Sequence, residues 1–103
     1  MKIKKPASAG TLESSDVFVS VAPNEGGGID IELESEVEAL FGDAMEAAVR
    51  RELALAGITE AAVRLQDHGA LDCVIAARVR CALYRAAEEF RISKGASTLS
   101  TFA

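Results

Sequence analysis

The stretch from Ala9 to Asp16 is rich in hydroxyl side chains and comes just before the first region with a clear strand pattern. It contains Thr11, Ser14 and Ser15. Serine and threonine hydroxyls can be esterified, so each of the three is a candidate acceptor for a covalent modification. Clusters of serine and aspartate also form ordinary turns. The residues alone therefore predict an exposed turn that offers hydroxyl groups, and they leave open which of these is used.

The remaining residues offer little for catalysis. His68 is the one histidine, and its place in a short Asp-His-Gly turn is typical of a solvated surface group rather than a general base. Gly26–Gly28 joins two expected strands and opens no helix, so it lacks the helix amino terminus of a phosphate-binding loop. The acidic alternation over 32–38 lacks the pattern of a calcium loop. We expect no catalytic residue and no metal ligand.

Two cysteines are too few for a disulfide framework or a structural zinc site. Cys73 and Cys81 each have apolar neighbours, which predicts that both are small core residues. Unpaired thiols of this kind indicate a reducing compartment, and we expect the cytoplasm. No apolar run approaches the ~20 residues of a membrane span, and the basic start has no apolar segment behind it, so we expect neither a membrane segment nor a secretory signal.

The charges are unevenly placed along the 103 residues, whose net charge is −5. No lysine or arginine occurs from Pro6 to Val49. Ten of the sixteen acidic residues lie in that stretch: Glu13, Asp16, Glu25, Asp30, Glu32, Glu34, Glu36, Glu38, Asp43 and Glu46. A surface of one negative sign repels phosphates, which disfavours nucleic-acid binding, and it attracts a basic protein partner. The same residues could instead form a solvated face that only aids solubility.

The elements that must position these groups follow from hydrophobic periodicity. Alternation predicts a hairpin of strands over 17–22 and 29–34, and later strands over 62–66 and 71–75. Helical spacing predicts helices over 36–56, with Phe41 on its apolar face, and over 76–91. The order ββαββα predicts an α+β two-layer sandwich, an antiparallel sheet with two helices on one face.

This pattern divides the chain into three parts. Residues 1–15 are expected to form a flexible segment that carries the hydroxyl cluster, and 16–91 the folded domain. Residues 92–103 have no period and are expected to form a loose tail. Ser35 and Glu38 have the spacing of a capping box at the start of the first helix, and Gly57 is placed to end it.

Several segments of the chain resemble the citrate lyase acyl carrier proteins. The amino-terminal run from Lys5 to Val17, with its Gly-Thr-Leu-Glu-Ser sequence, resembles the start of that family. Further matching segments are Ser35-Glu36-Val37-Glu38, Phe41-Gly42-Asp43-Ala44, Gly69-Ala70-Leu71-Asp72-Cys73 and Ala77-Arg78-Val79. The resemblance extends from about residue 1 to residue 87, and the segments occur in the family's order.

The resemblance implies a function and a site. In the family, the serine of Gly-Thr-Leu-Glu-Ser carries phosphoribosyl-dephospho-coenzyme A through a phosphodiester, which places the group on Ser14; the adjacent Ser15 is the less favoured acceptor. The terminal thiol of the group holds acetyl as a thioester. A transferase (alpha) subunit exchanges acetyl for citryl and releases acetate, and a lyase (beta) subunit cleaves citryl to oxaloacetate. The chain would then be a non-catalytic carrier of citrate fermentation, docked through its acidic residues on these subunits or on the enzyme that attaches the group.

Two other functions stay open. The acyl carrier subunit of malonate decarboxylase carries a group of the same kind. A protein of a different class, an assembly module that never receives the group, would have the same fold. A free-standing small enzyme is disfavoured by the single histidine.

Overall fold

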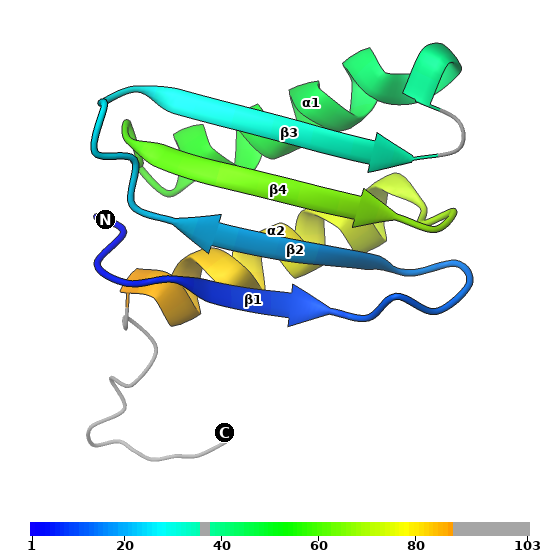
Figure 1. Ribbon diagram of the computed structural model, residues 1–103, viewed down its shortest axis with the longest axis horizontal. Helices are drawn as coiled ribbons and strands as arrows, with labels where there is room; N and C mark the ends of the chain where they lie inside the picture. The colour runs from blue at the N-terminus through cyan, green and yellow to red at the C-terminus, as the bar shows by residue number, and fades with distance from the viewer. Residues whose placement is uncertain (36–37, 88–103) are drawn as a thin grey trace.

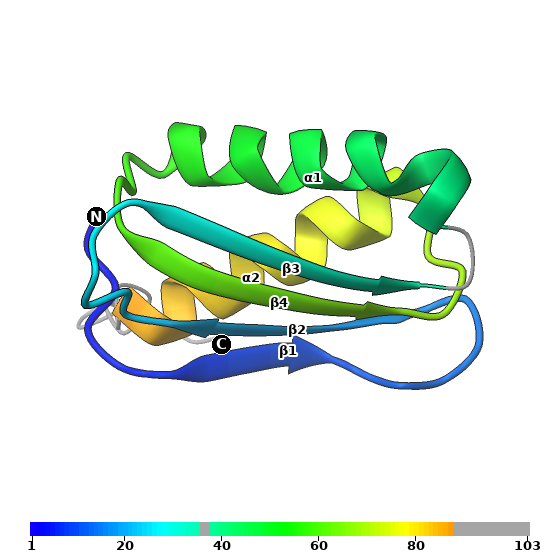
Figure 2. The ribbon, with the colours of Figure 1, turned by 45° about the horizontal axis from the view of Figure 1, so that its top comes forward.

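The computed structural model describes residues 1–35 and 38–87. Four strands form one sheet, and both helices pack on the same face of it (Figures 1 and 2). The elements in chain order are β1 Ala7–Gly10, β2 Val17–Ala22, β3 Ile29–Ser35, α1 Glu38–Leu55, β4 Ala61–Asp67 and α2 Asp72–Ala87. The predicted α+β class with two helices on one face is confirmed, but the order ββαββα is wrong: it is βββαβα.

The two middle strands, β2 and β4, build the centre of the core. In β2 the side chains of Val17, Val19 and Val21 are buried, and in β4 those of Val63 and Leu65 are buried. Their alternating neighbours face the uncovered side of the sheet. The period of two seen in the sequence therefore corresponds to the two faces of the strands.

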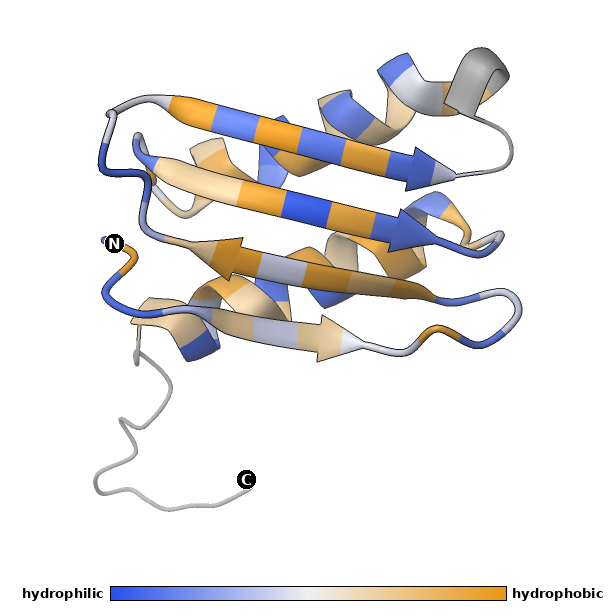
Figure 3. Cartoon of the chain, in the orientation of Figure 1, coloured by the Kyte–Doolittle hydropathy of each residue, from blue (hydrophilic) through white to orange (hydrophobic). Residues whose placement is uncertain are grey.

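The predicted hairpin between β2 and β3 does not form. The strand order is β1-β2-β4-β3, so β4 lies between β2 and β3 and pairs antiparallel with the first and parallel with the second. The sheet is therefore mixed rather than antiparallel. β3 suits an edge position because glutamates alternate with its half-buried apolar residues, and exposed charges on an edge strand oppose unwanted pairing (Figure 3). The more completely buried β4 takes the inner place.

A strand that the sequence did not predict, β1, forms the other edge. It pairs antiparallel with β2, and its Ala9 is buried. Ahead of it, Ile3 is buried, and the backbone amides of Lys4 and Lys5 donate to the carbonyl of Ala86, at distances of 3.0 and 3.2 Å. Much of the segment 1–15 is thus joined to the folded domain. The predicted tail over 92–103 lies outside the described residues.

The first helix matches its predicted extent closely. It buries Met45, Ala48, Val49 and Leu53. At its end the amides of Gly57 and Ile58 donate to the carbonyls of Ala54 and Leu53, the hydrogen bonds of a Schellman motif, which confirms Gly57 as the stop. The predicted capping box includes residues 36 and 37, outside the described part. Phe41, expected on the apolar face, is 54% exposed.

The second helix begins earlier than predicted, because 71–75 is not a strand. The amides of Val74 and Ile75 donate to the carbonyl of Leu71, which starts a helix that then buries Ile75, Val79 and Leu83 at helical spacing. A short apolar run fits both the strand period of two and the helical period of about 3.6, and the helical spacing of the buried residues from Ile75 onward identifies the segment as part of a helix.

The helices are joined by an ion pair: the guanidinium of Arg80 donates from Nε and Nη2 to the buried carboxylate of Glu52, at 3.0 and 3.1 Å. Within the described residues, no helix is long and apolar enough to cross a membrane.

Candidate functional site

The hydroxyl cluster lies on the loop between β1 and β2, at the end of the sheet where β3 and β4 also finish and both helices start (Figure 1). The amide of Asp16 donates to the carbonyl of Glu13 at 3.1 Å, which closes a four-residue turn. Ser15 has a φ of +66°, and it is the sole non-glycine residue with positive φ in the described part of the chain. This is the φ pattern of a type II turn, in which Ser14 and Ser15 are the two corner residues.

The two serines differ in how they are held. The Ser15 amide donates to the carbonyl of His68 at 2.7 Å, and the His68 amide donates to the carbonyl of Asp16 at 2.9 Å. These bonds fasten Ser15 and Asp16 to the turn that follows β4. Ser14 is exposed, and within the described residues its hydroxyl has no hydrogen-bond partner. Ser14 Oγ is thus free to react, while the backbone on its carboxyl side is fixed.

The carboxylate of Asp16 holds the base of the loop. The guanidinium of Arg78, on α2, donates to both its oxygens, from Nε to Oδ1 at 3.1 Å and from Nη2 to Oδ2 at 2.9 Å. The hydroxyl of Thr11 donates to Oδ2 at 2.6 Å, and the amide of Val17 to Oδ1 at 2.7 Å. The hydrogen bonds from Arg78, then those from Thr11 and Val17, hold the pKa of Asp16 well below its ordinary value. In turn, Asp16 raises the pKa of Arg78.

A first prediction concerns this carboxylate. Because the folded-state pKa of Asp16 is lowered, its contribution to stability is fully present above about pH 4 and declines as the pH falls further. We therefore expect Asp16→Asn to lower the urea midpoint of unfolding at pH 7, and expect the difference from wild type to narrow progressively between about pH 4 and about pH 2. Urea unfolding followed by circular dichroism at each pH measures this. A difference that stays constant over that range would contradict the assignment.

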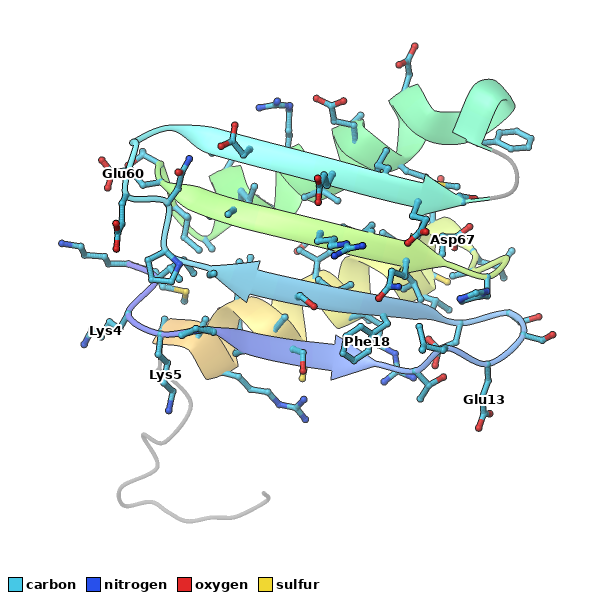
Figure 4. All side chains as sticks on the ribbon, viewed as in Figure 1. Lys4, Lys5, Glu13, Phe18, Glu60 and Asp67 are labelled. Carbon is cyan, nitrogen blue, oxygen red and sulfur yellow. The ribbon has the colours of Figure 1, made fainter. Side chains whose placement is uncertain are left out.

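Two other residues shape the loop and its support. Gly10 ends β1 with a φ of +97°, and a Cβ on it would lie 1.9 Å from the carbonyl oxygen of Val17. Asp67, at the end of β4, is buried; it accepts the amide of Ala70 and the hydroxyl of Ser35, both at 3.0 Å. This aspartate joins the ends of β3 and β4 to the turn against which Ser15 packs (Figure 4).

Most of the chain, including this loop, is similar in sequence to known proteins. A family model described as the malonate decarboxylase delta subunit (MdcD) matches residues 4–86. A citrate lyase acyl carrier protein of Escherichia fergusonii is 51% identical over 96 residues, which cover 93% of this chain and 99% of the relative. A citrate lyase acyl carrier protein of Haemophilus influenzae is 55% identical over 89 residues, covering 86% and 92%. The chain belongs to the family of the citrate lyase acyl carrier proteins.

Two solved structures resemble this chain in fold but not in sequence. Homoserine kinase of Cytophaga hutchinsonii superposes with a TM-score of 0.56 at 12% identity, over 87% of this chain and 36% of the kinase. A protein of Thermus thermophilus superposes with a TM-score of 0.51 at 13% identity, over 84% of this chain and 16% of that protein. The sequence relatives show that the chain is an acyl carrier protein, and its fold is a sheet with two helices on one face.

In this acyl carrier protein the predicted hydroxyl residues lie together on one loop, with different surroundings. The Thr11 hydroxyl donates a hydrogen bond to Asp16, whereas the Ser14 hydroxyl has no hydrogen-bond partner within the described residues. His68 is exposed, as predicted. Cys73 is also exposed, so the prediction of a core thiol there is wrong; it sits in the first turn of α2, where the sequence pattern predicted a strand. Cys81 is half-buried against the core.

Three residues that support the loop were not recognised from the sequence. Asp16 and Arg78 are 62 positions apart, and Asp67 looked like an ordinary turn aspartate. The one available signal was that Asp16 and Arg78 both lie in segments that resemble the family. That signal marks the residues but not their contact.

Proposed function

We propose that this chain is the acyl carrier subunit of citrate lyase and that Ser14 Oγ carries phosphoribosyl-dephospho-coenzyme A through a phosphodiester. The observation that carries the proposal is the identity of 51–55% with citrate lyase acyl carrier proteins over nearly the whole of both chains. In this function the chain is not itself catalytic. It works in the cytoplasm with the transferase (alpha) and lyase (beta) subunits and with the enzyme that attaches the group.

The geometry of the loop fits such a group on Ser14. Esterification needs a hydroxyl that is accessible and free of internal bonds, and Ser14 meets both conditions within the described residues. Ser15 is also exposed, but its backbone lies against the turn after β4: a Cβ on Gly69 would be 3.9 Å from the Ser15 Cα and amide nitrogen. An enzyme can therefore enclose Ser14 with less displacement of the protein.

The group, when bound, supplies a terminal thiol that holds an acyl group as a thioester. The residues of this chain hold its point of attachment: Arg78 and Thr11 fix Asp16, and the His68 backbone fixes Ser15. Because a tethered acyl group remains near the active sites of the assembled subunits, its effective concentration there is high. A fixed attachment point and a long arm thus suffice for a carrier subunit whose partners hold the catalytic groups.

The intact mass of the protein purified from its native host tests the proposal. We expect the mass of the chain plus phosphoribosyl-dephospho-coenzyme A, and fragmentation that places the added mass on Ser14. The protein made in a host that lacks the attaching enzyme provides the control and should have the bare chain mass. A bare mass in the native host would instead favour an assembly module that never receives the group.

The acyl carrier of malonate decarboxylase is the second candidate, because the matching family model bears that description. The two functions predict the same modification but different assemblies. Purification of the complex from the native host separates them: citrate cleavage to acetate and oxaloacetate supports our proposal, and malonate decarboxylation supports the alternative.

A further inference from the structure

Three large apolar side chains are exposed at the end of the sheet where the loop that carries Ser14 lies. Leu12 is 57% exposed, Phe41 54% and Leu71 70%, and all three lie at the end of the sheet where this loop is found. They make up three of the five large hydrophobic residues that are exposed in the described part of the chain. Single exposed leucines are common on protein surfaces, but Leu12 and Leu71 belong to two segments that contact each other next to Ser14, so they are candidates for an interaction site.

The two leucines lie on two segments that contact each other beside the serine. Leu12 is two residues before Ser14 on the same loop. Leu71 follows the turn after β4, and that turn contacts the loop directly through the 2.7 Å hydrogen bond from the Ser15 amide to the His68 carbonyl. A protein that covers Ser14 must therefore also cover the surface beside Leu12 and beside the turn that precedes Leu71.

Acidic residues accompany these apolar side chains. Glu13 follows Leu12 and points away from the body of the protein in Figure 4, and Asp72 follows Leu71; both are exposed. Arg78, which lies beneath the loop, is already engaged by both oxygens of Asp16. The serine end thus combines exposed leucines with exposed carboxylates.

We propose that this end, formed by Leu12, Glu13, Leu71 and Asp72, is the docking surface for the enzyme that attaches the prosthetic group to Ser14. The inference rests on the proposed function, which supplies the partner. The surface fits a partner with apolar pockets for the two leucines and a rim of lysine or arginine side chains for the carboxylates.

The reaction explains why this enzyme, rather than the lyase subunits, is the occupant. In this step Ser14 Oγ attacks the phosphorus of the donor's activated phosphate and loses its proton to a base of the enzyme; the Oγ–P bond forms as the bond from that phosphorus to the donor's leaving group, phosphate or pyrophosphate, breaks. The enzyme must therefore bring its active site to within bonding distance of Ser14 Oγ, and so it covers the surface beside Leu12 and the turn that precedes Leu71. The other subunits meet the far end of a long arm and need not touch this surface. An active site that transfers a phosphate-containing group also requires cationic side chains, and these complement Glu13 and Asp72.

The test compares rates of modification with the purified attaching enzyme of the native host and its activated group donor, followed by intact mass. We expect the double variant Leu12→Ala/Leu71→Ala to lose about tenfold or more in kcat/KM, mainly through KM, because apolar anchors at the centre of an interface dominate binding. Leu55→Ala is the matched control: Leu55 is 72% exposed at the opposite end, in the last turn of α1, and its loss should leave the rate unchanged.

A charge variant tests the rim. We expect Glu13→Lys/Asp72→Lys to reduce kcat/KM at low salt and the deficit to shrink as salt is raised. Glu25→Lys, in the loop between β2 and β3 at the other end, should have no such effect. The leucine variants and Glu25→Lys change exposed side chains and are expected to keep the wild-type melting temperature. Asp72→Lys places a cation in the first turn of α2, where the helix dipole favours an anion, so the charge variant is assayed well below its own melting temperature.

The failures of the two proposals are distinguishable. If wild-type protein is never modified, the proposed function is wrong. If wild-type protein is modified and the leucine double variant is modified equally fast, the docking surface is wrong while the carrier function stands. The docking surface is also overturned if the leucine variant is modified normally but fails to assemble with the lyase subunits, because that surface would then belong to a different partner.

Discussion

Ser14→Ala is expected to fold like wild type, to receive no prosthetic group and to give a complex with no citrate cleavage. The substitution removes the single oxygen to which the group would be esterified. It should change the free energy of unfolding by no more than about 0.5 kcal/mol, because Ser14 is exposed and its hydroxyl has no partner within the described residues. Intact mass after production in the native host, a thermal melt and an assay of the reconstituted complex measure these three properties.

The neighbouring serine supplies the control. Ser15→Ala keeps the Ser14 oxygen and the hydrogen bond from the Ser15 backbone amide to His68, so we expect it to be modified. Modification of Ser14→Ala together with a bare mass for Ser15→Ala would move the attachment point by one residue. A protein that is modified in both variants would show that neither serine is the acceptor.

Gly10→Ala is expected to lower the free energy of unfolding by about 3 kcal/mol or more. Two effects add at this position. The φ of +97° is unfavourable for any residue with a Cβ, and the added carbon would lie 1.9 Å from the carbonyl oxygen of Val17, far inside van der Waals contact. The backbone of β1 or β2 must shift to relieve the overlap. Urea unfolding measures the loss.

Gly28→Ala separates the two effects. Gly28 has a similar φ of +76°, but a Cβ added there would meet nothing within 4 Å, so alanine should cost only about 1–2 kcal/mol for the backbone conformation. Equal losses in the two variants would mean that the close approach to Val17 adds nothing. A Gly10→Ala protein that still folds should also be modified more slowly than wild type, because Gly10 sets the start of the serine loop.

The class of fold was predictable because burial follows periodicity. The buried valines of β2 and the apolar positions of α1 both lie at the spacing their sequence shows. Pairing was less predictable, since it depends on competition among strands. The alternating patterns of β2 and β3 were compatible with a hairpin. However, β4 buries more of its side chains than β3 does, and it occupies the position between β2 and β3.

The predictions for three parts of the chain were wrong for different physical reasons. β1 consists of small residues, Ala7 to Gly10, and has no apolar pattern, so its existence depends on pairing with β2. The segment 71–75 is a short apolar run that either a strand or a helix can accommodate. Phe41 fits the helical period and yet is 54% exposed, so the period alone did not identify which residues of the first turns of α1 are buried.

The candidate site was predictable only in part. The hydroxyl residues identified the loop, and the family resemblance selected Ser14 among them. The supports could not be predicted in the same way, because Asp16 and Arg78 meet through the tertiary fold, across 62 positions of sequence. A single sequence contains no local signal for such a contact.

The amino terminus lies at the end of the sheet opposite Ser14 (Figure 1). There the amides of Lys4 and Lys5 donate hydrogen bonds to a carbonyl at the carboxyl end of α2. An affinity tag or a surface linkage placed before Met1 would therefore point the serine loop toward the solution. Immobilised carrier oriented in this way could present its arm to free enzymes, which makes single-turnover measurements on a sensor surface practical without re-engineering the chain.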